Sequence, residues 1–402
     1  MMEGGSVKKL RGVMEEMSKI GIGILGTGCC LPETVVTGRD LVGLIDTSEE
    51  WMEQRTGIET RRIATPRESL PVLMTIAGQR ALDDAGLGVG DLSYIAVADN
   101  TTDPMHNPPT STRTQFLMGA QNIPCFNVGA GCTGASYGAM MLAGLIRQDY
   151  HYRGQTTNAL LIGGDILSNI TPMDDAHRSS AVVLADGVGA MVLGVEPDPT
   201  FGIQSMENHA DGSLGNKIHY GSRPYNQMVC TGPPAFGLPL SERELNPFMM
   251  DGRSIHKFIG TKCVDLVGAL LEGAGLEPKD LSEVTIVPHQ MNLRSIEMAV
   301  GKLESKLGVS PRQVYTEGVR KYGNNSTASI LIGLDELQRT RGIEMGDFVM
   351  GIAFGAGLTW GGFLTAWNKP PYKGPIVYDT RQQRAEVDRL NGQYDEWKAG
   401  LA

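Results

Sequence analysis

AGQRALDDAGLGVGDLSYIAVADN, at residues 77–100, is repeated in outline by VGALLEGAGLEPKDLSEVTIVPHQ at residues 267–290. The tripeptides Ala-Gly-Leu and Asp-Leu-Ser occur in both stretches and are separated by the same distance along the chain. Each stretch has the periodicity of an amphipathic helix that ends at glycine, followed by a short turn and an apolar strand. The pattern predicts a duplicated unit of alternating helices and strands.

Two further matches follow in the same order. GCTGASYGAMMLAGL, from Gly131, resembles NNSTASILIGLDEL, from Asn324, and ADGVGAMVLG at 185–194 loosely resembles FGAGLTWGGF at 354–363. Any single helix, turn and strand could match by coincidence, whereas matches in constant order favour a duplication. The alternation of helices and strands predicts an α/β fold, with mixed or parallel sheets covered by helices.

The repeat suggests a division of the chain into two halves with a segment at each end. We expect an N-terminal half at 22–200 and a C-terminal half at 201–367. A glycine- and proline-rich region at about 209–247 is typical of an insertion or lid. Residues 1–21 and 368–402 lie outside the repeat, and the latter is predicted to end in a surface helix.

Composition limits the function classes. The 402 residues are 41% hydrophobic and 20% charged, as in soluble globular proteins, and the formal charge of −10 argues against nucleic acid or an anionic membrane as the general partner. The sequence has no apolar run of the ~18 residues that span a bilayer and no signal-like N-terminus, which predicts a cytoplasmic protein. The six cysteines lack metal-ligand or disulfide-framework spacing, so we expect no metal site.

Three polar residues are expected at the ends of equivalent strands. Cys132 follows the strand IPCFNV, at the start of a helix whose dipole would favour the nucleophilic thiolate. His289 follows the strand TIVP, and Asn324 occupies the second repeat's counterpart of the cysteine turn. Ligands of such folds bind at the carboxyl ends of strands, so the three side chains are predicted to share one cleft.

Each residue alone has a purely structural explanation. Cys132 could be a small buried hydrophobe, His289 a turn histidine with satisfied hydrogen bonds, and Asn324 a left-handed turn or helix-cap residue. These explanations do not account for the equivalent positions of all three residues.

Five segments, covering roughly residues 22–367, resemble the β-ketoacyl-acyl-carrier-protein synthase III family of the thiolase-like superfamily. The segments are TSEEWMEQRTGIETRRIA from Thr47, GAGCTGASYG around Cys132, VPHQMNLR from Val287, YGNNSTAS from Tyr322 and FGAGLTWG from Phe354. The resemblance implies a thiolase-like fold, a duplicated five-layer α-β-α-β-α sandwich that forms a homodimer.

The resemblance also implies catalytic roles. Cys132 matches the nucleophile that accepts an acyl group, and His289 and Asn324 match the pair that stabilises the enolate formed when a malonyl-type thioester loses carbon dioxide. The backbone amides of Cys132 and Ala356 match the oxyanion hole. The family usually has glycine where this chain has Ala356, so the alanine would be strained if the turn required a positive φ.

The same resemblance also implies which residues bind the substrates. Trp51 and Arg178 match residues that sandwich the adenine of CoA, a role suited to an indole and a guanidinium. Further matches are Thr47, Arg55 and Asn292 for CoA and pantetheine, Lys257, Arg294 and Lys302 for docking of an acidic acyl carrier protein, and Asn107 for the primer pocket. Asn107 lies near the place where the family usually has a bulky residue, which predicts a primer other than plain acetyl.

We therefore expect an acyltransferase that condenses acyl-CoA with malonyl-CoA or malonyl-acyl carrier protein, in fatty-acid or specialised polyketide biosynthesis, with no further cofactor. One alternative is condensation without decarboxylation. Relatives of that kind use a glutamate on the dimer loop, where this chain has Asp103 and His106. Acyl transfer to an alcohol or amine is a second alternative, and a non-catalytic carrier-protein docking module is a third.

Overall fold

The fold is built around two five-stranded sheets of identical topology. The computed structural model describes residues 20–100, 107–222, 245–374 and 377–400. The first sheet has the order β5-β4-β6-β7-β1 and the second has the order β12-β11-β13-β14-β8. The strands of the first sheet are β1 (Gly21–Cys30), β4 (Leu92–Ala98), β5 (Cys125–Val128), β6 (Asn158–Asp165) and β7 (Gly187–Glu196). Those of the second are β8 (Gly202–Ala210), β11 (Val284–Pro288), β12 (Gln313–Val314), β13 (Phe348–Gly355) and β14 (Thr359–Ala366).

Strand directions repeat as well. β4 is parallel to β5 and β6, and β7 is antiparallel to β6 and β1. In the second sheet β11 is parallel to β12 and β13, and β14 is antiparallel to β13 and β8. The second sheet is therefore the counterpart of the first, strand for strand, which is the relation expected of a duplicated unit.

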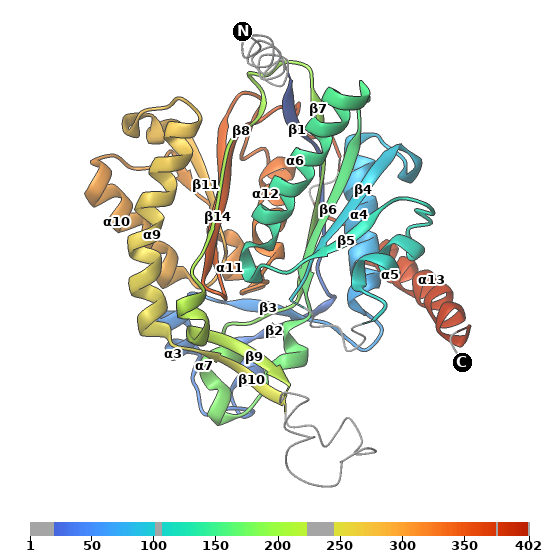
Figure 1. Cartoon of the computed structure of the whole chain (residues 1–402). Coiled ribbons are helices and arrows are strands. Elements are labelled where there is room, and N and C mark those ends of the chain that lie inside the picture. The colour runs from blue at the N-terminus through green and yellow to red at the C-terminus, as the bar shows by residue number, and fades with distance from the viewer. Residues whose placement is uncertain (1–19, 101–106, 223–244, 375–376, 401–402) are drawn as a thin grey trace.

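Helices form three layers around the sheets. α6 (Gly134–Arg153) and α12 (Ala328–Thr340) lie between the sheets, whereas α4 (Leu70–Ala85) and α5 (Thr110–Leu117) cover the outside of the first sheet, and α9 (Gly252–Gly273) and α10 (Leu293–Leu307) that of the second (Figure 1). The resulting five layers confirm the predicted α/β sandwich. Smaller elements are α2 (Gly38–Leu41), α3 (Glu49–Thr56), α7 (Arg178–Ala181), α11 (Glu317–Tyr322), β2 (Thr34–Thr37), β3 (Thr60–Ile63), β9 (Ile218–Ser222) and β10 (Leu245–Met250).

The central helices pack closely enough to require small residues in the sheet. Leu142 and Ile146 of α6 and Leu331 of α12 belong to one buried apolar cluster that fills the space between the sheets. A Cβ added to Gly189 of β7 would lie 2.5 Å from the Cβ of Leu331, so only glycine allows α12 to approach at this point. This packing fixes the two sheets relative to each other.

Helix ends follow the sequence pattern. α4 ends at Gly86, which has the left-handed φ of 68°, and Gly275 follows α9 with a φ of 72°. Glycine adopts this conformation without the steric conflict that a Cβ would cause. The two stretches that predicted a duplication thus form the same helix, turn and strand in both halves.

Segments outside the repeat are only partly described. Residues 1–19 and 223–244 lie outside the described residues, so most of the N-terminal extension and the centre of the predicted insertion cannot be compared with expectation. The described ends of the insertion include β9 and β10, which pair with each other. Among the described residues, no helix combines the length and the apolar character needed to cross a membrane.

The C-terminal segment forms a helix, α13 (Thr380–Ala399), with one buried face. Val387, Leu390 and Tyr394 join the apolar cluster of α4 and the first sheet. The Tyr394 hydroxyl also accepts a hydrogen bond of 3.0 Å from the buried Arg113 of α5. α13 is therefore a surface helix whose buried face packs against the outer layer of the first sheet.

Leu390→Ala is expected to lower the free energy of unfolding by about 2–5 kcal/mol, because Leu390 is fully buried and its removal leaves a cavity. Chemical denaturation followed by circular dichroism measures the change. Arg389→Ala is the matched control, since it removes an exposed ion pair with Glu386 and an exposed hydrogen bond to Gln393 and should change stability by about 0–1 kcal/mol. Equal effects of both substitutions would contradict a packed α13.

Candidate active site

Two turns meet at Cys132. The cysteine lies in the single-turn helix η2 (Gly131–Thr133), between β5 and α6. A Cβ added to Gly131, whose φ is 56°, would lie 2.9 Å from the backbone nitrogen and oxygen of Ala356. A Cβ on Gly355 would lie 2.7 Å from the Cys132 nitrogen. The two glycines thus allow the cysteine turn and the turn after β13 to touch.

This contact surrounds the sulfur of Cys132 with hydrogen-bond donors. The backbone N–H groups of Cys132 and Ala356 both donate toward it, and the Ser326 hydroxyl lies 3.5 Å from it. Ala356 is not among the described non-glycine residues with positive φ, so the strain considered for an alanine here does not arise. The amide that the family provides from a glycine is present in this chain without a conformational penalty.

The resting cysteine is a neutral thiol. Burial raises the pKa of Cys132 to about 11, and the negative charge of Asp165 acts in the same direction. The Ser326 hydroxyl and the two backbone amides lower the pKa but do not offset burial. The sequence predicted a position that favours the thiolate, but burial outweighs the hydrogen bonds that lower the pKa of the thiol.

His289 is a buried, neutral imidazole. Its backbone N–H donates to the Ile352 carbonyl at 2.7 Å, which attaches it to β13, and its Nδ1 lies 3.1 Å from the Ser329 hydroxyl. Burial lowers the pKa of His289 to about 4, although a hydrogen bond with the Ser326 backbone partly opposes this effect. At neutral pH the ring is therefore uncharged and carries a single N–H, rather than being a cation.

Asn324 is held by its backbone and by one side-chain oxygen. Its N–H donates to the Val183 carbonyl at 3.0 Å, and its carbonyl accepts from the Ala185 N–H at 3.0 Å. Its Oδ1 accepts a hydrogen bond of 2.9 Å from the Ser326 backbone. Because a backbone N–H can only donate, this bond fixes the amide orientation and leaves the Asn324 Nδ2 available as a donor.

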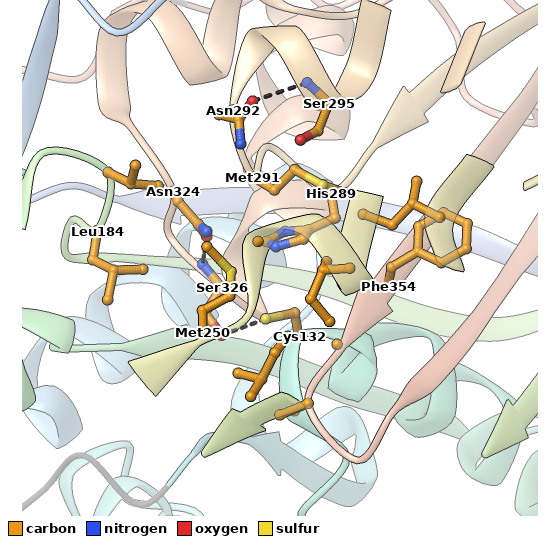
Figure 2. Close-up of a pocket in the computed structure, with 18 of the residues that line it drawn as sticks. Cys132, Leu184, Met250, His289, Met291, Asn292, Ser295, Asn324, Ser326 and Phe354 are labelled. Atoms are coloured by element: carbon orange, nitrogen blue, oxygen red, sulfur yellow. Dashed lines mark hydrogen bonds between the residues drawn. The ribbon is translucent and has the colours of Figure 1, made fainter. Parts of the chain in front are cut away.

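Cys132, His289 and Asn324 line one cleft, and Figure 2 shows their side chains converging from three separate elements. Apolar side chains form most of the remaining wall, among them Ile255, Phe354 and Leu358. A largely apolar cleft with a few convergent polar groups is typical of an enzyme site for a small molecule. Among the described residues, no cluster of histidine, cysteine and carboxylate side chains could hold a metal ion.

Comparison with known proteins identifies the family. The 3-oxoacyl-[acyl-carrier-protein] synthase III model matches residues 126–212, and the model of that family's C-terminal region matches residues 271–367. A β-ketoacyl-[acyl-carrier-protein] synthase III from Caldanaerobacter subterraneus subsp. tengcongensis is 38% identical over 351 residues, which cover 87% of this chain and 99% of that protein. The chain belongs to the 3-oxoacyl-[acyl-carrier-protein] synthase III family.

Solved structures agree with this assignment. The synthase III of Aquifex aeolicus is 31% identical, with a TM-score of 0.72, and the match covers 86% of this chain and 100% of that one. The priming β-ketosynthase of a polyketide biosynthetic pathway is 29% identical, with a TM-score of 0.74, and covers 88% and 98% respectively. The predicted family, fold class and enzyme class, an acyltransferase of the synthase III type, are thereby confirmed.

Of the residues matched to CoA binding, Asn292 lines the cleft, whereas Thr47, Trp51, Arg55 and Arg178 are not part of its described wall. The Arg178 guanidinium lies 4.9 Å from the centre of the Trp51 ring, so the two side chains stack on each other. Asn292 lines the cleft and caps α10, since its side chain accepts from the Ser295 N–H at 2.9 Å. Thr47 has a buried hydroxyl without a hydrogen-bond partner among the described residues, whereas Arg55 is exposed.

The three residues matched to carrier-protein docking are exposed on α9 and α10. Lys257 lies on α9, and Lys302 of α10 packs its side chain over Gly260 of α9. The Arg294 guanidinium already has partners within the chain, because it forms an ion pair with Glu297 and donates a hydrogen bond of 2.8 Å to the Gln54 carbonyl.

Asn107 is exposed and does not line the cleft within the single chain. The resemblance places it on a loop that spans the dimer, so its role in the primer pocket stays a prediction about the dimer. The loop residues Asp103 and His106 lie outside the described residues.

Sequence reasoning missed the residues that contact Cys132 and His289. Ser326 contacts the sulfur and Ser329 contacts His289, yet both lie within the segment YGNNSTAS that was examined for Asn324. Asp165, at the end of β6, is fully buried beside them. The sequence did contain a signal for Asp165: it is a polar residue at the carboxyl end of an apolar strand, as Cys132 and His289 are.

We expect His289 to titrate with a pKa near 4, well below the usual value of 6.5, because the buried site disfavours its charged form. Nuclear magnetic resonance of the imidazole resonances, assigned with His289→Gln, measures this pKa directly. Between pH 6.5 and 4 this histidine is protonated in the unfolded chain but stays neutral in the folded chain. The free energy of unfolding therefore decreases as the pH falls through this range. A resonance of His289 that titrates near pH 6.5 would contradict a desolvated ring.

Proposed function

We propose that the protein catalyses a decarboxylative Claisen condensation between an acyl group carried on Cys132 and a malonyl-type thioester, in fatty-acid or polyketide biosynthesis. One observation carries the proposal: a single cleft holds a cysteine sulfur facing two backbone N–H groups, together with a neutral His289 and an oriented Asn324 amide. The family assignment supports the same reaction class.

The first half-reaction transfers the acyl group. The Cys132 sulfur adds to the carbonyl carbon of an acyl-CoA, and the amides of Cys132 and Ala356 stabilise the oxygen as its negative charge develops. The carbon–sulfur bond to CoA then breaks, and the CoA thiolate takes up the proton that the Cys132 thiol has lost. The product is a thioester on the cysteine.

The second half-reaction forms the new carbon–carbon bond. The malonyl carboxylate leaves as carbon dioxide, and the electron pair of the broken bond passes to an enolate whose oxygen accepts hydrogen bonds from His289 and Asn324. The enolate carbon attacks the acyl-cysteine carbonyl, and the Cys132 thiolate leaves. Neutral donors suit this step because a cationic histidine would also bind and retain the malonyl carboxylate.

Substrate contacts follow the matched positions. We propose that CoA binds along Thr47, Trp51, Arg55, Arg178 and Asn292, which requires Trp51 and Arg178 to separate so that adenine can enter between them. The orphan hydroxyl of Thr47 and the position of Asn292 in the cleft support this path. We propose Lys257, Arg294 and Lys302 as the docking patch for an acidic malonyl-acyl carrier protein, since all three are exposed.

Assembly and location are further parts of the proposal. Edge strand β5 pairs only with β4 among the described strands, so its outer side is available to a second copy in a homodimer. The five described cysteines are all free, which suits the reducing cytoplasm. The domain boundaries at 22–200 and 201–367 stay our interpretation, supported by the repeated sheet topology.

His289→Ala and Asn324→Ala should each lower condensation by about 100- to 1000-fold while leaving acylation of the protein measurable, because each removes one donor to the enolate oxygen. Intact-protein mass spectrometry after incubation with a panel of acyl-CoAs measures acylation, and addition of malonyl-CoA or malonyl-acyl carrier protein then measures discharge. Cys132→Ala is the control and should carry no acyl group.

The same assay separates the alternatives. Discharge of the acyl group by a second acyl thioester without release of carbon dioxide would indicate non-decarboxylative condensation. Discharge by an alcohol or amine would indicate simple acyl transfer, and failure to form any acyl-enzyme would indicate a docking module. Any of these results would contradict the proposed function.

A further inference from the structure

A chain of polar side chains leads from a buried carboxylate to the Cys132 sulfur. The Asn100 Nδ2 donates to the Asp165 Oδ2 at 2.8 Å and to the Ser326 Oγ at 2.7 Å. The Ser326 Oγ in turn lies 3.5 Å from the sulfur. Asp165 and Ser326 are 0% and 3% exposed, so solvent does not replace these bonds. Neither half-reaction described above uses Asn100 or Asp165.

The direction of the bonds follows from the chemistry of the groups. The Asn100 amide nitrogen can only donate, so the Ser326 Oγ accepts from it and retains its single hydrogen for another acceptor. Two acceptors are in reach of this hydrogen, the Asp165 carboxylate and the Cys132 sulfur. The position of one proton therefore decides whether the sulfur receives a hydrogen bond from a side chain, in addition to those from the two backbone amides.

Asp165 does not depend on the Ser326 hydrogen. It accepts from the Asn100 backbone N–H and from the Asn100 Nδ2, each at 2.8 Å. The Thr327 hydroxyl lies 3.1 Å from the Asp165 carboxylate and 3.2 Å from the Ala98 carbonyl, so its single hydrogen serves one of the two. A carboxylate with two other donors gains less from a third than an otherwise poorly solvated thiolate gains from its first hydroxyl donor. As negative charge develops on sulfur, the Ser326 hydrogen is thus directed toward Cys132.

The backbone at Ser326 is held in an uncommon conformation that aims this hydroxyl. Its φ is 50°, in the left-handed region that few non-glycine residues adopt. The Asn324 Oδ1 accepts the Ser326 N–H at 2.9 Å, so the residue that positions the serine is the one proposed to bind the enolate. Such conformations persist where surrounding contacts impose them, commonly at functional sites.

We propose that Ser326 is a positioning residue for Cys132, whose hydroxyl donates to the sulfur and stabilises the thiolate, and that Asn100 and Asp165 fix the direction of that hydrogen bond. The titratable side chains of the cleft are His289, which follows β11, and His256 of α9, and the carboxylate of Asp165 lies at the end of β6, within hydrogen-bond reach of Ser326. Burial and the charge of Asp165 oppose the thiolate, whereas Ser326 is the side chain that favours it. The role of Ser326 in catalysis rests on the proposed function, whereas its stabilisation of the Cys132 thiolate does not.

The test is the pH dependence of Cys132 alkylation by iodoacetamide, followed on the full-length protein by mass spectrometry of the peptide that contains Cys132. Ser326→Ala should move the inflection to higher pH and lower the rate at pH 8 by about tenfold, which corresponds to a pKa change of about one unit. Ser326→Gly should give the same shift while tolerating the positive φ, so that a folding defect in one variant does not decide the result. Asn100→Ala should shift the profile in the same direction, because the hydroxyl can then turn toward Asp165.

Ser329→Ala is the matched control, because it removes a neighbouring hydroxyl that contacts His289 instead of the sulfur, and should leave the alkylation profile unchanged. The proposal would be overturned if the alkylation profiles of both Ser326 variants coincided with that of the unsubstituted protein. It would also be overturned if Ser329→Ala shifted the profile as much as the Ser326 variants do. If the Ser326 variants shift the profile but no acyl-CoA acylates the unsubstituted protein, the proposed function fails and the hydrogen bond to the thiol stands.

Discussion

The contact between the cysteine turn and the turn after β13 is the constraint on which the site depends. It joins the first half of the duplicated fold to the second, and it exists because Gly131 and Gly355 leave no Cβ between the two backbones. The same contact brings the amide of Ala356 to the sulfur of Cys132. Neither half alone contains the complete site, since Cys132 comes from one half and His289 and Asn324 come from the other.

Desolvation acts differently on the two titratable residues to which we assign catalytic roles. For His289, burial keeps the ring neutral, as required of a donor to an enolate oxygen. For Cys132, burial holds the resting sulfur as a thiol, so the thiolate must be stabilised locally by hydrogen bonds. Burial therefore favours the proposed condensation by keeping His289 neutral. The proposed acyl transfer, in contrast, depends on hydrogen-bond donors that stabilise the Cys132 thiolate. The amides of Cys132 and Ala356 and the Ser326 hydroxyl are those donors.

The repeat in the sequence predicted the fold class and the convergence of Cys132, His289 and Asn324, because equivalent strands place their carboxyl ends together. The ionisation state of Cys132 was not predictable, since a helix dipole is visible in a sequence pattern but the extent of burial is not. Ser326 and Asp165 were missed for a similar reason: their contacts join β6, the Asn324 turn and the cysteine turn, which are far apart in the chain. The burial of one face of α13 likewise depends on its contact with α4 and α5.

The central claim is that Cys132 carries the acyl group with its carbonyl oxygen between the two facing amides. A crystal structure of the protein acylated on Cys132 tests this claim most directly. The account predicts that the carbonyl oxygen lies about 2.7–3.1 Å from the backbone nitrogens of both Cys132 and Ala356, with His289 and Asn324 open to a second substrate. A carbonyl oxygen turned away from both amides, or an acyl group on a different residue, would contradict it.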